Sequence, residues 1–250
     1  MSRWLAPVGL IAAAIGVWEL VVRLTDTPDY LFPAPSGVAS ALWSDGGTLG
    51  SATLVTLREI TLGYLIAVVA ALAIAILLHF SAVLRRAVLP ILVVSQTIPT
   101  VALAPILAIL FGFGIGPKLI VVAIVCFFPI VVNTVDGLRS TDAELIRMMR
   151  TLHGDRYAIF RRVEFPGALP SIFSGCRIAA TYAAVGAVFA EWGGSSSGLG
   201  FVMLQAQPEL DTSLIFAALV ILSAAALALY GLVTLAERIL IPWSREVSHA

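Results

Sequence analysis

Long apolar stretches alternate with shorter polar segments along the whole chain. A helix needs about 20 apolar residues to cross the hydrocarbon core of a bilayer. Six stretches satisfy this length: 4–24, 55–80, 87–111, 117–136, 172–190 and 213–236. Strands of a membrane barrel would be about ten residues long and would alternate polar with apolar positions, which runs such as 67–78 do not. The pattern therefore predicts an all-α polytopic membrane protein with six transmembrane helices.

Positive charges gather in alternate connecting segments. The segments 25–54, 112–116 and 191–212 contain no Lys or Arg. Eleven of the 15 basic residues flank the opposite ends of the predicted spans: Arg3, Arg85, Arg86, Arg139, Arg147, Arg150, Arg156, Arg161, Arg162, Arg238 and Arg245. Because Lys and Arg near span ends mark the cytoplasmic side, both termini are predicted to be cytoplasmic. The stretch 4–24 is longer than the apolar region of a signal peptide and is interpreted as a retained helix.

Composition excludes several classes of protein. Charged residues make up 12% of the chain, about half the usual share of a soluble domain. The 15 basic residues balance the 15 acidic ones, whereas a nucleic-acid-binding protein would show a basic excess. The two cysteines, Cys126 and Cys176, have neither zinc-site spacing nor the pattern of a disulfide framework. The sequence thus predicts no nucleic-acid partner and no metal site.

The predicted cytoplasmic segment 137–171 is too long for a plain connection. Thr141 or Asp142 is expected to cap a short helix that has Glu144 in its first turn. The tripeptide 153–155, His-Gly-Asp, is expected to end this helix.

A second short helix is expected from Arg156 to about Phe165, and Pro166 and Pro170 are expected to break it before the fifth span. Both short helices would be apolar on one face and arginine-rich on the other. Such a pair could rest on anionic lipid or could bind a cytoplasmic subunit.

This segment resembles the EAA loop of the membrane subunits of bacterial ABC importers. The family pattern is EAA, three residues, Gly, nine residues and I-x-L-P. Aligned on 163–166, Val-Glu-Phe-Pro, the glycine position falls on His153 and the EAA positions fall on 147–149, Arg-Met-Met. The chain thus departs from the pattern, with arginine in place of glutamate. Because Gly154 follows one residue later, a glycine still lies at the turn, and the turn is expected to survive.

Other segments resemble permeases of the nitrate/sulfonate/taurine type. They are DYLFPAPSGV, TIPTVALAPILAILFGFGIGPK, FFPIVVNTVDGL, AEWGGSSSGLG and ERILIPW. Within this group, the details SSSGLGFVML and ERILIPW are most similar to permeases for thiamine-precursor pyrimidines or riboflavin.

The resemblance implies a type I ABC importer permease fold, with 1–250 as a single transmembrane permease domain in the bacterial inner membrane. It implies four partners: a cytoplasmic ABC ATPase dimer, a second permease copy in a homodimer, an extracytoplasmic solute-binding protein and membrane lipid. ATP and Mg would be bound by the ATPase, because this chain has no G-x-x-x-x-G-K-[ST] sequence. The chain is therefore expected to be no enzyme and to hold no cofactor. The expected ATPase-coupling residues are Glu144, Arg147, Met148, Met149, Leu152, His153, Gly154, Phe165 and Pro166.

The third predicted span carries two prolines, Pro99 and Pro105, beside polar side chains. Prolines free backbone carbonyls, which the membrane tolerates only beside protein or a watery cavity. The span is either a kinked structural helix or part of the solute pathway. The residues expected to line a pathway are Gln96, Thr97, Thr100, Asn133 and Tyr182.

Glu191, Gly198 and Gly200 are expected to form an outer gate in the Gly/Ser-rich segment after the fifth span. This segment matches the G-x-S-x-G pattern of serine hydrolases at 194–198, but it follows a helix rather than a strand, and the three histidines lie elsewhere. An intramembrane enzyme is therefore disfavoured.

A proton-coupled secondary transporter or channel remains the alternative. Such a protein would need inverted repeats and several acidic residues within its spans. Glu19 is the one clear acidic residue within a predicted span, and Arg23 lies at helical spacing from it. Arg58, Glu59 and Arg177 are expected to snorkel to the membrane surface.

Small residues at four-residue spacing are candidates for an interface between two copies: Gly9, Ala13, Gly63 and Ala67.

Overall fold

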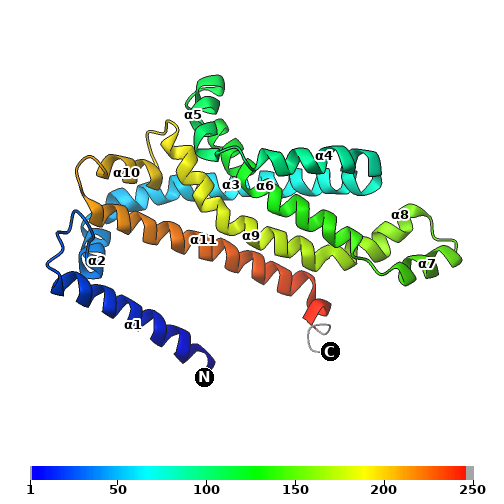
Figure 1. The fold of residues 1–250 in the computed structure, drawn as a ribbon, viewed down its shortest axis with the longest axis horizontal. Coiled ribbons are helices and arrows are strands. Elements are labelled where there is room, and N and C mark those ends of the chain that lie inside the picture. The colour runs from blue at the N-terminus through cyan, green and yellow to red at the C-terminus, as the bar shows by residue number, and fades with distance from the viewer. Residues whose placement is uncertain (1, 246–250) are drawn as a thin grey trace.

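The computed structural model describes residues 2–245, and between these residues it contains helices and no strand. Figure 1 shows their arrangement. The α-helices are α1 Ser2–Leu24, α2 Pro35–Ser44, α3 Gly46–Phe80, α4 Ala82–Ser95, α5 Thr100–Phe111, α6 Ile115–Arg139, α7 Ala143–Thr151, α8 Arg156–Ile159, α9 Phe165–Trp192, α10 Leu199–Ala206 and α11 Thr212–Leu240. A π-helical turn, Phe160–Glu164, joins α8 to α9, and a 3₁₀ turn, Pro242–Arg245, follows α11.

Long apolar helices form the body of the molecule. Among the described residues, α3, α6, the continuous helix 156–192 and α11 are each long and apolar enough to cross a membrane. The bent pair α4–α5 adds a fifth candidate. The prediction of a helical protein with several spans is confirmed. Six spans and cytoplasmic termini stay predictions, as does the crossing of the membrane by α1, which occupies the first predicted span.

The third predicted span, 87–111, is not one continuous helix. α4 ends at Ser95, α5 begins at Thr100, and the two helices meet at 98°. Pro99 is the physical cause, because a proline disfavours helical geometry in the residue before it and cannot donate a backbone hydrogen bond. The break places Gln96 and Thr100 on either side of a bend inside the apolar part of the chain.

Small residues allow α3, α6 and α9 to approach one another closely. Ala67, Ala71 and Ala75 repeat every four residues along α3 and are fully buried. A Cβ atom on Gly63 would lie 2.6 Å from Cβ of Val122 in α6. The expectation that Gly63 and Ala67 form an interface between two copies is therefore wrong, because both residues are used within the chain. A Cβ atom on Gly9 would meet nothing within 4 Å, so no contact inside the chain occupies its position.

The two ends of the bundle carry different short helices. Figure 1 shows α7 and α8 at one end, and α2 and α10 at the other. α1 lies apart from the bundle along most of its length and approaches it near α2. There Glu19 pairs with Arg23 at 2.6 Å, as expected, and also accepts a hydrogen bond of 3.0 Å from the backbone N–H of Ser36. Glu19 therefore ties α1 to the first turn of α2.

Candidate functional site

The helix α7 projects from one end of the bundle with an apolar face open to solvent. Asp142 caps it by accepting a hydrogen bond of 2.8 Å from the N–H of Glu144, which confirms one of the two predicted caps. Leu145, Met148 and Leu152 repeat at helical spacing and are 47%, 55% and 67% exposed. Such a helix with no cover over its apolar side is typical of a docking element.

The remaining predicted coupling residues lie on or directly after this helix, except for two. Arg147 and Met149 belong to α7, and His153 and Gly154 form the turn that follows it. Phe165 and Pro166 lie apart from them, at the start of α9.

The turn after α7 differs from the expected glycine turn. His153 has a φ of +59°, in the left-handed region that glycine favours, whereas no positive φ occurs at Gly154. Gly154 is needed for a different reason, because its N–H donates to the carbonyl of Met149 at 2.8 Å and an added Cβ would lie 2.8 Å from the same oxygen. The turn is thus present and Gly154 lies in it, as expected, but the left-handed residue is His153 and not the glycine.

Replacing His153 with glycine is expected to stabilise the protein. A left-handed conformation costs a non-glycine residue about 1–2 kcal/mol, and glycine gives back about 0.5–1 kcal/mol through its greater freedom in the unfolded chain. H153G should therefore raise the thermal midpoint in detergent by a few degrees, whereas H153A, which keeps the strain, should not. A lower midpoint for H153G would contradict this reading of the turn.

The segment after the turn is one helix and not a separate short one. α8, the π-helical turn and α9 run without interruption from 156 to 192, so the predicted break at Pro166 and Pro170 is wrong. Pro166 lies in the first turn of α9, directly after the π-helical turn, and Pro170 is accommodated inside the helix. The π-helical turn accommodates Pro166, because the regular i→i−4 pattern of backbone hydrogen bonds is already interrupted there.

Contacts join the base of α9 to the end of α3. Glu164 and His79 lie 2.8 Å apart, and both side chains are largely buried. Arg156 donates a hydrogen bond of 2.7 Å to the carbonyl of Phe80 and lies over the ring of that residue. Phe160 packs on both His79 and Phe80. A displacement of the α7–α8 hairpin would thus act on two long helices at once.

Four of the five predicted pathway residues meet in one cavity. Its volume is about 570 Å³, and it lies between the α4–α5 break, α6 and α9. Its polar lining residues are Gln96, Thr100, Asn133 and Tyr182. Thr97 does not line it, and its hydroxyl donates to the carbonyl of Val94 within its own segment. The prolines thus act mainly through Pro99, which turns the chain so that Gln96 and Thr100 face the same space.

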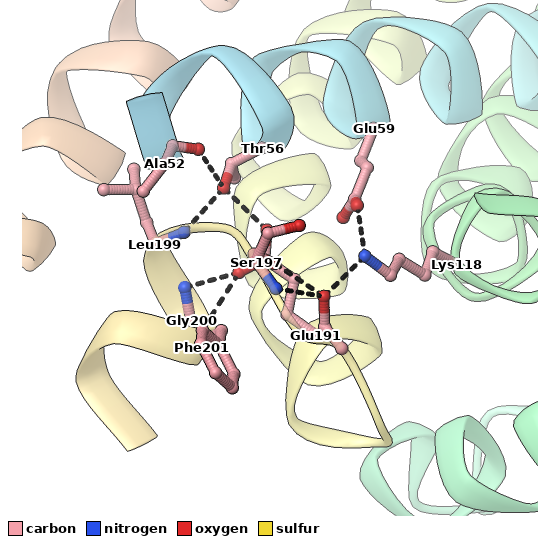
Figure 2. A network of polar contacts seen from close by, with 10 residues as sticks. Ala52, Thr56, Glu59, Lys118, Glu191, Ser197, Leu199, Gly200 and Phe201 are labelled. Atoms are coloured by element: carbon pink, nitrogen blue, oxygen red, sulfur yellow. Dashed lines mark hydrogen bonds and ion pairs between the residues drawn. The ribbon is translucent and has the colours of Figure 1, made fainter. Parts of the chain in front are cut away.

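A buried carboxylate holds the opposite end of the bundle together. Glu191, at the end of α9, has no exposed surface. Its Oε1 accepts a hydrogen bond of 2.6 Å from Thr56 of α3, and its Oε2 accepts from the N–H groups of Gly200 and Phe201 at the start of α10 (Figure 2). A carboxylate at a helix N-terminus is favourable because the free N–H groups and the helix dipole point toward it.

Two of the expected gate residues are glycines because the carboxylate lies against them. Gly198 has a φ of +113°, and an added Cβ would collide with the Glu191 carboxylate. A Cβ on Gly200 would lie 2.9 Å from Oε2 of Glu191. Glu191, Gly198 and Gly200 are therefore brought together as predicted, and their function as a gate stays a prediction.

An ion pair extends this group of residues. Lys118, at the start of α6, binds Glu59 of α3 at 2.6 Å (Figure 2). It also donates a hydrogen bond of 2.6 Å to Ser195 of the segment before α10. Glu59 is 2% exposed, so the expectation that it snorkels is wrong, while its neighbour Arg58 is exposed. Arg177, also expected to snorkel, pairs with Glu237 of α11. We call Thr56, Glu59, Lys118, Glu191 and Ser195 the carboxylate network.

Sequence reasoning missed Thr56, Lys118 and Ser195. One signal was available: Thr56 and Glu59 lie three residues apart within an apolar stretch and so share a helix face. Their partners, Glu191 and Lys118, lie 135 and 59 positions away along the chain, and no local pattern predicts such a pairing.

The fold is that of a helical membrane protein with a solvent-exposed amphipathic hairpin at one end. Residues 59–246 match the family described as binding-protein-dependent transport system inner membrane component, and the chain belongs to this family. A probable ABC transporter permease protein of Haemophilus influenzae is 39% identical over 91% of this chain and 93% of its own length.

The names of two further relatives state the solute that they transport. A formylaminopyrimidine transport permease protein of Halalkalibacterium halodurans is 35% identical over 92% of both chains. A riboflavin transport system permease protein of Chloroflexus aurantiacus is 38% identical over 90% of this chain and 85% of its own.

Membership of the family defines the general activity. The chain is a permease component of an ABC transport system in the inner membrane, and it is a transport subunit and not a catalytic enzyme. Permease components of ABC importers work with an ATPase and a binding protein. The resemblance found in the sequence is thereby confirmed.

Proposed function

We propose that the chain is the solute-translocating subunit of an ATP-driven importer, that it works as a homodimer, and that it binds an ABC ATPase dimer through α7. The observation that carries the proposal is the exposed apolar face of α7, formed by Leu145 and Met148 and extended by Leu152, the residue directly after the helix. ATP and Mg would bind to the ATPase, and this chain would need no cofactor of its own. An extracytoplasmic protein would deliver the solute at the α2–α10 end.

The contacts at the base of the bundle support a direct mechanical link between α7 and the cavity. α7 connects through the turn at His153 and Gly154 to the continuous helix 156–192, which carries Tyr182 in the cavity lining. The pair His79–Glu164 joins the same hairpin to α3. A movement of the docked ATPase would therefore tilt α9 and α3 together and would change access to the cavity, in the manner of a rigid-body switch.

The proposal assigns 1–250 to one permease domain, with 137–171 as its coupling segment. It keeps six spans, of which α1 is the first and the bent pair α4–α5 the third, and it keeps both termini on the cytoplasmic side. Gln96, Thr100, Asn133 and Tyr182 would line the solute pathway, and the segment held by Glu191, Gly198 and Gly200 would be its outer gate. Lipid surrounds the apolar faces in this arrangement.

The solute is proposed to be a thiamine-precursor pyrimidine or riboflavin, in preference to an anion of the nitrate or sulfonate kind. The two relatives named for formylaminopyrimidine and riboflavin transport are 35% and 38% identical to this chain, whereas a putative aliphatic sulfonates transport permease of Bacillus subtilis is 30% identical. The sequence segments SSSGLGFVML and ERILIPW support the same subgroup.

Affinity purification from membranes in mild detergent tests the proposal. We expect an ATPase with a Walker motif to co-purify in roughly equal amounts, and L145M, which keeps the apolar face, to retain it. If the chain purified alone, remained stable and moved solute without ATP, the proposal would be wrong. The proton-coupled secondary transporter or channel would then take its place.

A further inference from the structure

The cavity between the α4–α5 break, α6 and α9 has the properties of a small-molecule site. Its volume of about 570 Å³ falls within the range of ligand pockets, about 300–1,000 Å³. Such pockets are mainly apolar and have a few polar groups that orient the ligand. Here, nine of the 13 lining residues are apolar and four are polar.

The polar side chains of the cavity have hydrogen-bonding capacity to spare. Within the described part of the chain, the side chains of Gln96, Thr100 and Tyr182 make no hydrogen bond. Asn133 donates from Nδ2 to the carbonyl of Pro129 at 2.8 Å, which leaves its Oδ1 as an acceptor. Gln96 is exposed and Tyr182 is 50% exposed, so these polar groups are open to a molecule that enters the cavity. Their convergence on one cavity therefore favours an occupant that hydrogen-bonds.

The cavity offers no counter-charge. None of its lining residues is Asp, Glu, Lys, Arg or His. An anion such as a sulfonate would lose its hydration on entry, and no cation would compensate that loss. The lining therefore favours an uncharged solute.

Aromatic and proline side chains make up much of the cavity lining. Phe128, Tyr182 and Phe189 contribute rings, and Pro99 and Pro129 contribute further apolar faces. Aromatic rings bind other rings in offset or edge-to-face arrangements, which add to the burial of their surface. A flat heterocycle could pack against the aromatic rings and also form hydrogen bonds with the polar side chains.

We propose that this cavity is a solute-binding site within the permease itself, selective for an uncharged, flat, heterocyclic ring with hydrogen-bonding groups on its edge. The inference rests on the proposed function and deepens it, because it assigns part of the selectivity to this chain in addition to the external binding protein. Tyr182 would orient the ring through its hydroxyl group, and Gln96 and Thr100 would bind from the other side of the cavity.

Calorimetric binding to the full-length chain in lipid nanodiscs tests this inference, with no ATPase or binding protein present. The probes are riboflavin, a formylaminopyrimidine and ethanesulfonate. We expect at least one of the two ring compounds to bind, and ethanesulfonate not to bind. Y182F and Q96M should each weaken ring binding about five- to tenfold, the effect of one lost hydrogen bond. The matched control Y230F, on α11 outside the cavity lining, should bind as the unchanged chain does.

Three results would overturn the inference: binding of neither ring compound, equal binding of ethanesulfonate, or equal losses in Y182F and Y230F. Since binding is measured without the ATPase, these results leave the proposed function standing. A failure of the ATPase to co-purify would contradict the proposed function instead.

Discussion

The double substitution L145E/M148E is expected to abolish co-purification of the ATPase and to lower solute uptake by at least about 30-fold. The physical reason is that two charges would enter an apolar contact, where the loss of a single central residue already costs about 2 kcal/mol or more. Both side chains are about half exposed in the isolated chain. Their replacement should therefore leave the free energy of unfolding within about 0.5 kcal/mol of its original value.

The matched control is L145M/M148L, which conserves volume and apolar character. It should keep both the ATPase and the uptake. Measurements of uptake in cells, of the ATPase-to-permease ratio after purification and of the thermal midpoint separate a docking defect from misfolding. If L145E/M148E kept full uptake, α7 would not be the docking element.

The substitution K118M is expected to lower the free energy of unfolding by about 3–5 kcal/mol, the usual effect of removing one partner of a buried ion pair. Lys118 is 13% exposed and Glu59 is 2% exposed, so the Glu59 carboxylate would be left buried without its cation. The same change would release Ser195 and with it the segment that carries Gly198. Thermal unfolding in detergent measures the stability, and limited proteolysis measures the release of that segment.

A second substitution distinguishes the ion pair from simple loss of packing. E59L in the K118M background should restore a large part of the stability, because it removes the uncompensated charge, while Glu191 keeps its bonds from Thr56 and Gly200. R58M is the control, since Arg58 is adjacent in sequence but exposed. If K118M were no more harmful than R58M, the carboxylate network would not hold this end of the bundle.

The features that follow from local pattern could be predicted from the sequence. Helical spans follow from the length of their apolar stretches, and the cap at Asp142 follows from its place before the periodic residues of α7. The i,i+4 pair of Glu19 and Arg23 is likewise a local relation. Gln96 and Thr100 were found because polar groups beside prolines are unusual inside an apolar stretch, whereas Asn133 and Tyr182 were candidates only as polar side chains within predicted spans.

The features that depend on distant parts of the chain could not be predicted. The bend of 98° at Pro99 was expected only as a kink, because a proline fixes one dihedral angle but tertiary contacts decide how far the chain turns. The helix continues through Pro166, where a break was expected, because a π-helical turn directly precedes this proline. Glu59 was expected at the membrane surface, because no local pattern reveals its partner, Lys118, which lies 59 residues away.

Solute uptake into proteoliposomes, with the chain reconstituted together with its co-purifying ATPase and its external binding protein, tests the central claim most directly. The account predicts that uptake requires ATP and Mg on the side where α7 lies, and that L145E/M148E removes the ATP-dependent uptake while the protein stays folded. Uptake by the chain alone, driven by a proton gradient and unaffected by ATP, would contradict it.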